Sequence, residues 1–393
     1  MNEIDIAVIG AGPIGLAMAR ALAGLQQRTV LIDPASEDQL AQPGDDGREI
    51  ALTHASRALL NQLGVWAHLP PADICPLRLA QVMDGNSSFA LRFGADLMQT
   101  QDLGWLVPNA HLRRASWQAI QAQPNLSFQM GRTLEQVQCS RDGVVLQLSD
   151  DQLYRARLLV VADGRRSPTR QRLGVGAQMR QFGQQMLLCR MELEHAQPYT
   201  ALEWFQYGQT LAILPLTQPL ASVVMTLPPD DIEQLLSADE NHFNQQVTEL
   251  YQRRFGRMQL AGARHVSPLL VSYAQTFCCH RVALIGDAAV GMHPMTAHGY
   301  NFGLRSVARL VGQLRYALDA EQDIGNLARL AEYTRQHRLA TYPLYQATVS
   351  IACLYERHTP AIRCVRAGLL RAAQWSKPFR HAVVAQLTAA SAW

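Results

Sequence analysis

The sequence lacks the features that mark several classes of protein. Its seven cysteines include no C-x-x-C pair and are irregularly spaced, which favours free thiols in a reducing compartment over disulfides or zinc. No apolar run reaches the roughly 18 residues that a membrane-spanning helix needs. The net charge is only +3, and no Lys/Arg-rich run is interleaved with aromatic residues, so nucleic acid is not an expected partner. We therefore expect a globular, cytoplasmic protein.

Signals for export and for metal binding are also missing. The chain carries Glu3 and Asp5 near its start and enters a strand at once, which is unlike a signal peptide. The histidines show no H-x-x-x-H spacing on one helix; those considered as ligands are His54, His111, His195, His265 and His293. No metal site is predicted.

The first segment whose residues indicate a ligand site is a glycine-rich turn. Residues 6–9 form an apolar run typical of a strand buried on both faces, and Gly10, Gly12 and Gly15 follow in the order G-x-G-x-x-G. These glycines allow a tight turn, a close approach by a pyrophosphate and close packing of helix on strand. Asp33 lies 23 positions after Gly10, where an acid binds an adenosine ribose. The pattern predicts a dinucleotide site, with NAD and FAD both open.

Two later segments repeat the order of strand, turn and helix. Residues 158–162 read as a buried strand, followed by the turn Asp163-Gly164 and a helix start at Ser167-Pro168. Near residue 285 a second apolar strand ends in Gly286-Asp287, passes through a small-residue loop and enters a helix near Tyr300. Taken alone, each segment is equally compatible with a plain strand–turn–helix unit.

In this order, the three motifs resemble those of the single-component flavoprotein aromatic hydroxylases, the para-hydroxybenzoate hydroxylase type, over about residues 3–345. The resemblance implies FAD, with Asp163-Gly164 near both FAD and the NAD(P)H route. It implies that Asp287 binds the ribityl hydroxyls, with the Gly286 and Gly299 backbone against the flavin ring. Asn301 would bond the pyrimidine edge, and Pro294 would lie near the face where oxygen reacts.

Within that family the chain looks most like the ubiquinone-biosynthesis hydroxylases. The segments that carry this likeness are DGREIALTHASRALLNQLGVW, GWLVPNAHLRRA, GDAAVGMHP and HGYNFGLRS. Arg48 matches an arginine that reaches FAD in relatives, with a surface arginine as the alternative. Asn109 and Arg113 fall on a flavin-contacting segment, but Ala110 stands where many relatives have arginine.

A second departure concerns the loop before the last helix. Most quinone hydroxylases have Gly-Gln-Gly where this chain has Ala297-His298-Gly299, and together with DGREIALTH and WFQYGQTLA this loop favours the branch that hydroxylates demethoxyubiquinol. His298 is either a packing residue or a flavin-facing one.

The predicted fold is α/β, with a Rossmann-like FAD-binding domain, an inserted antiparallel-sheet substrate domain and a helical C-terminal region. Strand-like runs between Met186 and Thr226 suggest a sheet that covers the flavin, with one of Trp204, Phe205 and Tyr207 in the substrate pocket. We assign residues 1–75, 106–180 and 276–345 to the FAD-binding domain, 76–105 and 181–275 to the substrate domain, and 346–393 to the helical region.

The implied activity is ring hydroxylation of a ubiquinone precursor, a polyprenyl quinol or phenol, by a C4a-hydroperoxyflavin formed from NAD(P)H-reduced FAD and molecular oxygen. The cofactor carries this chemistry, so no side-chain nucleophile is expected. Another phenolic substrate, a flavin reductase of isoprenoid chains and a non-catalytic flavoprotein subunit of a quinone-synthesis complex remain alternatives. A halogenase would be expected to show W-x-W-x-I-P, which is absent.

The last part of the chain is basic. Between residues 350 and 393 the only acid is Glu356, and Ile362, Val365 and Leu369 fall at helical spacing. The first interpretation is a packed helix with a solvated basic face. The second is contact with the inner face of a membrane through Arg363, Arg366 and Arg371, with Trp375 and Phe379 at the interface; other quinone-biosynthesis proteins are a third kind of partner.

Overall fold

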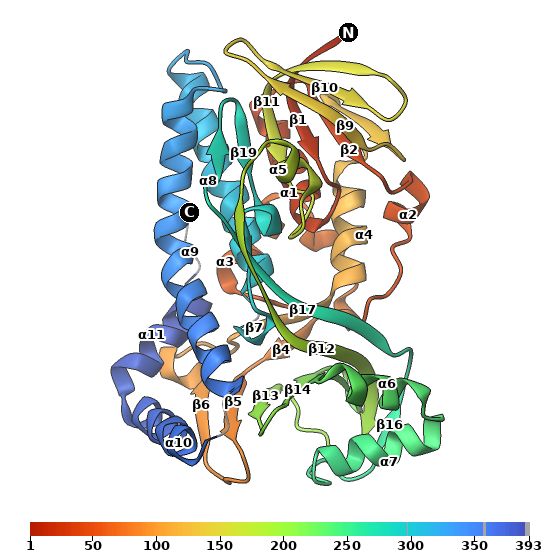
Figure 1. Ribbon diagram of the computed structural model, residues 1–393, viewed down its shortest axis with the longest axis vertical. Coiled ribbons are helices and arrows are strands. Elements are labelled where there is room, and N and C mark those ends of the chain that lie inside the picture. The colour runs from red at the N-terminus through yellow and green to blue at the C-terminus, as the bar shows by residue number, and fades with distance from the viewer. Residues whose placement is uncertain (297, 357–358, 390–393) are drawn as a thin grey trace.

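Two large sheets lie one above the other in the computed structural model, which describes residues 1–296, 298–356 and 359–389 (Figure 1). Helices cover the outer side of each sheet and form a separate group at one side of the molecule. This is the α/β arrangement predicted from the sequence.

The upper sheet is built around a parallel core. Strand β1 (Asn2–Ile9) lies at its centre and pairs in parallel with β2 (Thr29–Asp33) and β11 (Leu153–Val161). Residues 6–9 are buried, as expected for a strand covered on both faces. The remaining strands are β8 (Leu126–Met130), β9 (Leu134–Cys139), β10 (Val144–Leu148), β18 (Cys278–Cys279) and β19 (Val282–Leu284).

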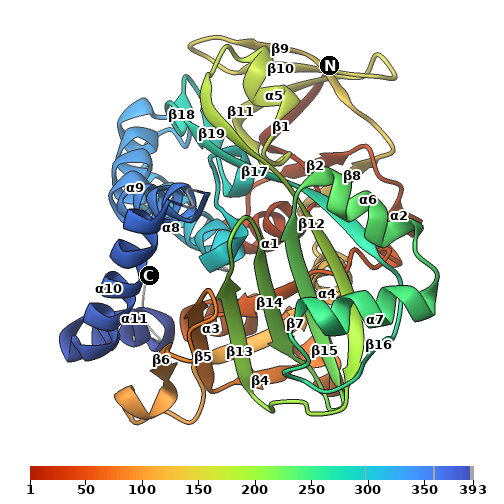
Figure 2. The same ribbon diagram turned by 60° about the horizontal axis from the view of Figure 1, so that its bottom comes forward.

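The lower sheet has two differently occupied faces. One face packs on α6 (Pro229–Ser237) and α7 (Glu240–Leu250), burying Trp204 and Phe243, and the other faces the parallel sheet (Figure 2). In order across the sheet, its strands are β20 (Val290–Gly291), β17 (His265–Ala274), β12 (Ala177–Leu193), β15 (Leu220–Leu227), β14 (Thr210–Pro215), β13 (Thr200–Phe205), β5 (Leu79–Asp84) and β6 (Ala90–Gly94), with β16 (Met258–Leu260) also paired to β12.

Short elements connect the two sheets. A small sheet is formed by β3 (Glu49–Leu52), β7 (Gly104–Pro108) and β4 (Cys75–Leu77). The helices around the upper sheet are α1 (Pro13–Leu22), α2 (Glu37–Ala41), α3 (His54–Gln62), α4 (Asn109–Ile120) and α5 (Pro168–Arg172).

The C-terminal region is helical, as predicted. Helices α8 (Gly299–Asp319) and α9 (Leu327–Glu356) pack against each other, and α8 also packs on α1. Helices α10 (Pro360–Trp375) and α11 (Lys377–Thr388) lie beside β6, where Leu370 and Val384 join Leu91 and Phe93 in a small apolar core.

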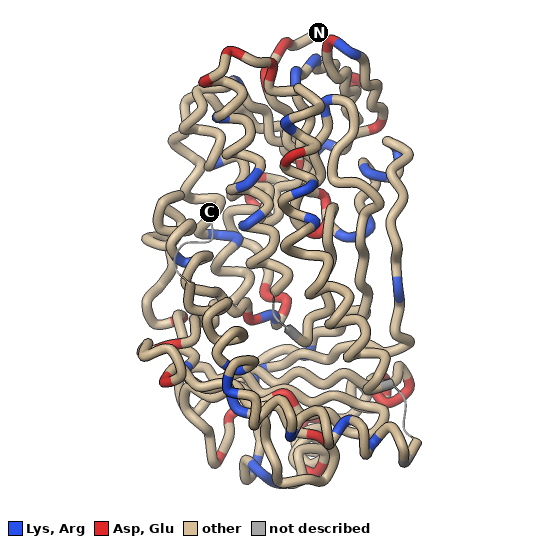
Figure 3. The backbone as a smooth tube through the Cα atoms, turned by 90° about the vertical axis from the view of Figure 1, so that its left-hand side faces the viewer, with Lys and Arg blue, Asp and Glu red and all other residues tan. Residues whose placement is uncertain are grey.

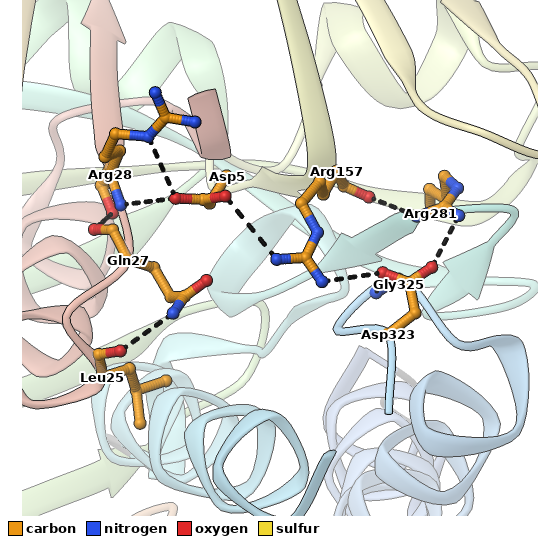
Figure 4. Close-up of polar contacts among 9 residues, drawn as sticks. Asp5, Leu25, Gln27, Arg28, Arg157, Arg281, Asp323 and Gly325 are labelled. Atoms are coloured by element: carbon orange, nitrogen blue, oxygen red, sulfur yellow. Dashed lines mark hydrogen bonds and ion pairs between the residues drawn. The ribbon is translucent and has the colours of Figure 1, made fainter. Parts of the chain in front are cut away.

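A network of charged side chains fastens the turn between α8 and α9 to the upper sheet (Figure 4). Arg157 on β11 lies 3.6 Å from a carboxylate oxygen of Asp5 and 3.4 Å from one of Asp323. Arg281 lies 2.6 Å from the other Asp323 oxygen. Burial opposes ionisation of Asp323, but the hydrogen bonds from Arg281 and the Gly325 amide and the charges of both arginines together outweigh it and lower the Asp323 pKa. Elsewhere, positive and negative positions are interspersed along the chain (Figure 3).

The second sheet starts before the predicted division at residues 180 and 181. Strand β12 begins at Ala177 and runs without a break to Leu193, so the division falls inside one strand. A single register shift interrupts its pairing with β17, between Gln181 and Gln185.

Candidate functional site

One cavity of about 580 Å³ lies between the two sheets. The upper sheet and its loops contribute Gly12, Asp33, Arg48, Asn109 and Gly164, among others, and the second sheet contributes Gln184, Met186, Glu203, Phe205, Thr210 and Ala212. Residues 287–300 close one side with Asp287, His293, Pro294, Gly299 and Tyr300. Parts of the chain more than 180 residues apart therefore share one space.

The G-x-G-x-x-G turn has the geometry predicted for it. Gly10 has φ +104°, and a Cβ there would lie 2.6 Å from the Ala162 carbonyl oxygen. A Cβ on Gly15 would lie 1.8 Å from the carbonyl oxygen of Gly10, so helix and turn require glycine at both places. Gly12, by contrast, faces open space, and a Cβ there would meet no atom within 4 Å. Its open surface is part of the cavity lining.

Asp33 ends β2 beside this turn, and it lines the cavity. One of its carboxylate oxygens accepts a hydrogen bond from the Ala11 amide at 2.5 Å, and the other accepts one from the Ala35 amide at 2.8 Å. The carboxylate is thus fixed against the glycine turn while it also faces the cavity.

The Gly286-Asp287 turn follows β19 and lies against α1. Gly286 has φ +55°, and a Cβ there would lie 3.0 Å from the Ile14 side chain. Asp287 lines the cavity and accepts a hydrogen bond from Arg165 at 2.7 Å. Arg165 also donates to the Leu270 carbonyl at 2.6 Å, which fixes the guanidinium between the two sheets.

Arg165 is a site residue that the sequence reasoning missed. It follows Asp163-Gly164 directly, in the run DGRRSP, so its place beside a predicted motif was the available signal. Gly164 lines the cavity with φ +87°, whereas Asp163 holds the start of α5 by accepting hydrogen bonds from Ser167 and from the Thr169 amide.

Arg48, Asn109 and Arg113 all line the cavity, as the resemblance implied for a flavin-contacting group. Arg48 forms an ion pair with Asp46, and Asn109 donates to the same carboxylate at 2.8 Å. Burial opposes ionisation of Asp46, but the hydrogen bonds from Arg48 and Asn109 outweigh it and lower the Asp46 pKa. Asp46 therefore positions two of the three predicted residues.

Asn301 is not among the residues that line the cavity, and its contact with the pyrimidine edge stays a prediction. The Asn301 side-chain oxygen accepts hydrogen bonds from the Thr53 amide at 3.0 Å and the Ser56 hydroxyl at 2.6 Å, and its nitrogen donates to Ala51. The side chain is almost fully buried, so it joins α8 to the β3–α3 connection. An amide can satisfy buried backbone groups as well as a ligand, and the sequence does not separate the two.

His298 is also outside the cavity lining. It precedes α8, and its ring lies 5.8 Å from that of Phe302, which agrees with the packing alternative. Ala297, part of the same departure from the family pattern, lies outside the described residues. Pro294 and Gly299 do line the cavity.

Burial shifts the pKa values of two titratable side chains close to Pro294. Burial, and then the nearby charge of Arg165, lowers the His293 pKa to about 4, so its imidazole is neutral at pH 7. Burial raises the pKa of Tyr300, whose buried hydroxyl has no hydrogen-bond partner within the described residues. Beside the Arg165–Asp287 ion pair, this end of the cavity therefore holds a neutral imidazole and one hydroxyl without a partner among the described residues.

The cavity face of the second sheet is mainly apolar. Phe205 lines it, whereas Trp204 faces the opposite core and Tyr207 is exposed, so one of the three candidate aromatics reaches the cavity. Glu49 lies at its edge and accepts a hydrogen bond from Arg190 at 2.8 Å; burial outweighs that bond and raises the Glu49 pKa to about 7.

The residues present fit FAD. Gly12 leaves open the space where a phosphate would approach the start of α1, and that helix has no acid in its first turn. The free amides and the positive end of the helix favour a phosphate there. The buried Tyr300 hydroxyl, which has no partner among the described residues, could bond a ligand held in the cavity. The described residues contain no group of three or more metal-ligating side chains, and none of their helices is long and apolar enough to cross a membrane.

Comparison with known proteins agrees with this geometry. The FAD binding domain family model matches residues 3–342. Ubiquinone hydroxylase UbiM of Neisseria meningitidis is 37% identical over 388 residues, 98% of this chain and 84% of the relative. The 3-demethoxyubiquinol 3-hydroxylase of Escherichia coli is 28% identical over 94% of each chain.

A solved structure supports the fold. The p-nitrophenol 4-monooxygenase PnpA of Pseudomonas putida superposes with a TM-score of 0.80 over 98% of both chains, at 17% identity. The family match covers most of the chain, and a curated hydroxylase exceeds 30% identity over nearly all of it. The chain therefore belongs to the FAD-binding domain family, and FAD is its cofactor.

Proposed function

We propose that this protein hydroxylates the aromatic ring of a ubiquinone precursor, a polyprenyl quinol or phenol, and that a demethoxyubiquinol-type ring is its specific substrate. The observation that carries the proposal is the cavity, which joins the dinucleotide turn at Gly12 to an apolar sheet face at Phe205. The names of the related hydroxylases supply the substrate class.

Each part of the cavity has a role in this reaction. When bound, FAD supplies electrons from NAD(P)H and activates molecular oxygen. Gly12 and the start of α1 would hold its phosphates, Asp33 its ribose, and Asp287 with Arg165 its ribityl chain. The apolar sheet face would hold the substrate ring and exclude water, which protects a reactive oxygen species from wasteful decay.

Labelled molecular oxygen tests the reaction. The purified protein with FAD, NAD(P)H and a short-chain ubiquinone-precursor phenol is expected to give a hydroxylated product whose new oxygen comes from O₂. The product is measured by mass spectrometry, with labelled water as the control arm. Label arriving from water, or a wild-type protein that folds but binds no flavin, would overturn the proposal.

We also propose that α10 and α11 contact an anionic membrane surface, from which the polyprenyl substrate would be taken. Val365 and Leu369 are 53% and 56% exposed and lie four residues apart on α10, so they share a face. Trp375 is 76% exposed. Arg371 and Lys377 are exposed nearby, and the described residues of α10 and α11 include no acid. Apolar side chains beside cations suit an anionic lipid interface.

Vesicle co-sedimentation tests this contact. Each cation near an anionic surface contributes about 1 kcal/mol, so the double variant R371Q/K377Q is expected to bind phosphatidylglycerol vesicles about 30-fold more weakly than wild type. R253Q removes an exposed cation at the far end of α7 and is the matched control. Equal sedimentation of all three proteins would contradict the proposed contact of α10 and α11 with a membrane.

A further inference from the structure

Glu203 is a carboxyl group placed on the apolar face of the second sheet. It lies on β13, in register with Ala212 on β14 and Val82 on β5. Side chains alternate along a strand, so Glu203 and Phe205 share one face while Trp204 takes the other. Both Glu203 and Phe205 line the cavity, and Trp204 is fully buried on the opposite side with its indole nitrogen donating to the Gly85 carbonyl.

Glu203 differs from the other carboxyl groups that line this cavity. Asp33 accepts two backbone amides, Glu49 pairs with Arg190, and Asp287 pairs with Arg165. Within the described residues, no side chain or amide donates a hydrogen bond to Glu203. Its side chain is half-buried and faces the cavity, so a ligand bound there can supply the hydrogen-bond partner that the protein does not.

The groups around Glu203 leave its carboxyl uncompensated. Tyr251 lies beneath the sheet, but its hydroxyl donates to the Ala212 carbonyl at 3.0 Å. Tyr355 stacks on Phe205 at 3.8 Å, and the Arg366 guanidinium over Tyr355 is paired with Asp84. The other titratable or cationic residues of the lining are Arg48, Arg113, Arg165, His293, Tyr300 and Tyr355. Burial alone accounts for the rise of the Glu203 pKa to about 8.

We infer that Glu203 binds the ring hydroxyl of the aromatic substrate and exchanges a proton with it. The inference rests on the proposed function, because it assigns a residue to the substrate of that reaction. A neutral Glu203 donates its proton in a hydrogen bond to a ring oxygen, and an ionised Glu203 accepts one from a ring hydroxyl.

Proton transfer at this pair would prepare the ring for hydroxylation. The ring O–H bond breaks, the proton passes to a carboxylate oxygen of Glu203, and the electron pair stays on the ring oxygen. The ring carbons ortho and para to that oxygen become more electron-rich and react more readily with an electrophilic oxygen. The transfer needs no reagent beyond the two groups, and it reverses when the product regains its hydroxyl.

The pH dependence of hydroxylation tests the inference. In wild type, kcat for a short-chain phenol is expected to rise with pH through a limb near pH 8. In E203Q the limb is expected to move toward pH 10, the ordinary pKa of a phenol, with a loss of up to about 100-fold at pH 8. E203D, which restores a carboxyl group, should recover part of the lost rate and move the rise in kcat back toward pH 8.

Two measurements separate this role from a structural one. E203Q should bind FAD with wild-type affinity, measured by flavin fluorescence, and E192Q should match wild type in every assay because Glu192 is an exposed carboxyl on the same sheet. If wild type hydroxylates and E203Q keeps its rate and its pH profile, the inference is wrong. If wild type binds FAD but hydroxylates no ubiquinone-precursor ring, the proposed function is wrong, and this result is seen in the wild-type protein before any variant is compared.

Discussion

Positions 12 and 15 are both glycine, but the physical reason for glycine differs between them. Gly15 lies where helix α1 touches its own entry turn, so its missing side chain serves packing within the protein. Gly12 faces the cavity, and a Cβ there would meet no atom of the chain within 4 Å, so its missing side chain leaves room for a ligand. Its backbone, with φ −67° and ψ 172°, is also one that alanine adopts without strain.

The two glycines therefore give a matched pair of variants. G12A is expected to keep the Tm of the FAD-free wild-type protein and to weaken FAD binding at least about tenfold, because the added methyl group occupies the phosphate cradle. G15A is expected to lose about 3 kcal/mol of stability or more, because overpacking at a 1.8 Å contact forces the turn to move. Thermal unfolding and flavin titration measure both. Normal FAD binding by G12A would show that the phosphates lie elsewhere.

Asp287 gives a second prediction at this scale. Replacing Asp287 by alanine removes a charged hydrogen-bond acceptor from the cavity and is expected to weaken FAD binding by about 1.5–3 kcal/mol, or roughly 10- to 160-fold. R165K is the companion variant, since it keeps the charge but loses the two fixed bonds to Asp287 and Leu270. Unchanged affinity in D287A would remove this carboxylate from the flavin site.

Single residues also mark the limit of sequence reasoning. The place of Asp33 was predictable because the chain between Gly10 and Asp33 is one continuous strand–helix–strand unit. Asn301 was not, because its partners Thr53 and Ser56 are about 250 residues away, at the start of helix α3. Glu203 was not either, since its significance is that no side chain or amide of the described residues donates a hydrogen bond to it.

At the scale of one element, α10 is a packed helix with exposed cations, as the first interpretation of the basic tail had it, but one arginine of the second interpretation is buried. Periodicity at Val365 and Leu369 correctly indicated a helix but not which face is covered, and these two residues face outward. Arg366 is instead almost fully buried, paired with Asp84 on β5. It is therefore not available to a lipid surface, and its inclusion among the membrane-contacting arginines was wrong. Asp84 is 282 positions away, so the sequence offered no local sign of the pair.

Arg366 and Arg371 should consequently behave differently. R366Q leaves Asp84 buried without its partner, and breaking a buried pair costs about 3–5 kcal/mol, so α10 is expected to detach from β6. R371Q changes an exposed position and should stay within about 0.5 kcal/mol of wild type. Limited proteolysis of the segment after residue 359, together with chemical unfolding, measures the difference. Equal protection of the two variants would contradict the buried pair.

At the scale of the whole molecule, FAD would contact parts of the chain that lie far apart in the sequence. Residues of the first turn, of the second sheet and of the loop before α8 all line the same cavity. A ligand that binds only the folded state stabilises it by about 2.7 kcal/mol at 100 times its Kd. Removal of FAD is therefore expected to lower the Tm by a few degrees, measured by calorimetry. G12A, with its weaker FAD binding, should show a smaller difference, and an equal shift in that variant would count against the site.

Strands β12 and β17 also have a mechanical consequence. They pass together from the upper half of the molecule into the lower one (Figure 1), paired from Ala177 and Ala274 at one end to Leu188 and His265 at the other. Two paired strands behave as a stiff beam, since bending them stretches a ladder of hydrogen bonds. The ladder of hydrogen bonds is interrupted only at the register shift between Gln181 and Gln185, which contains Gly183 at φ +67°. The sheet that carries Glu203 is thus held at a fixed distance from the glycine turn by paired backbone rather than by side-chain packing.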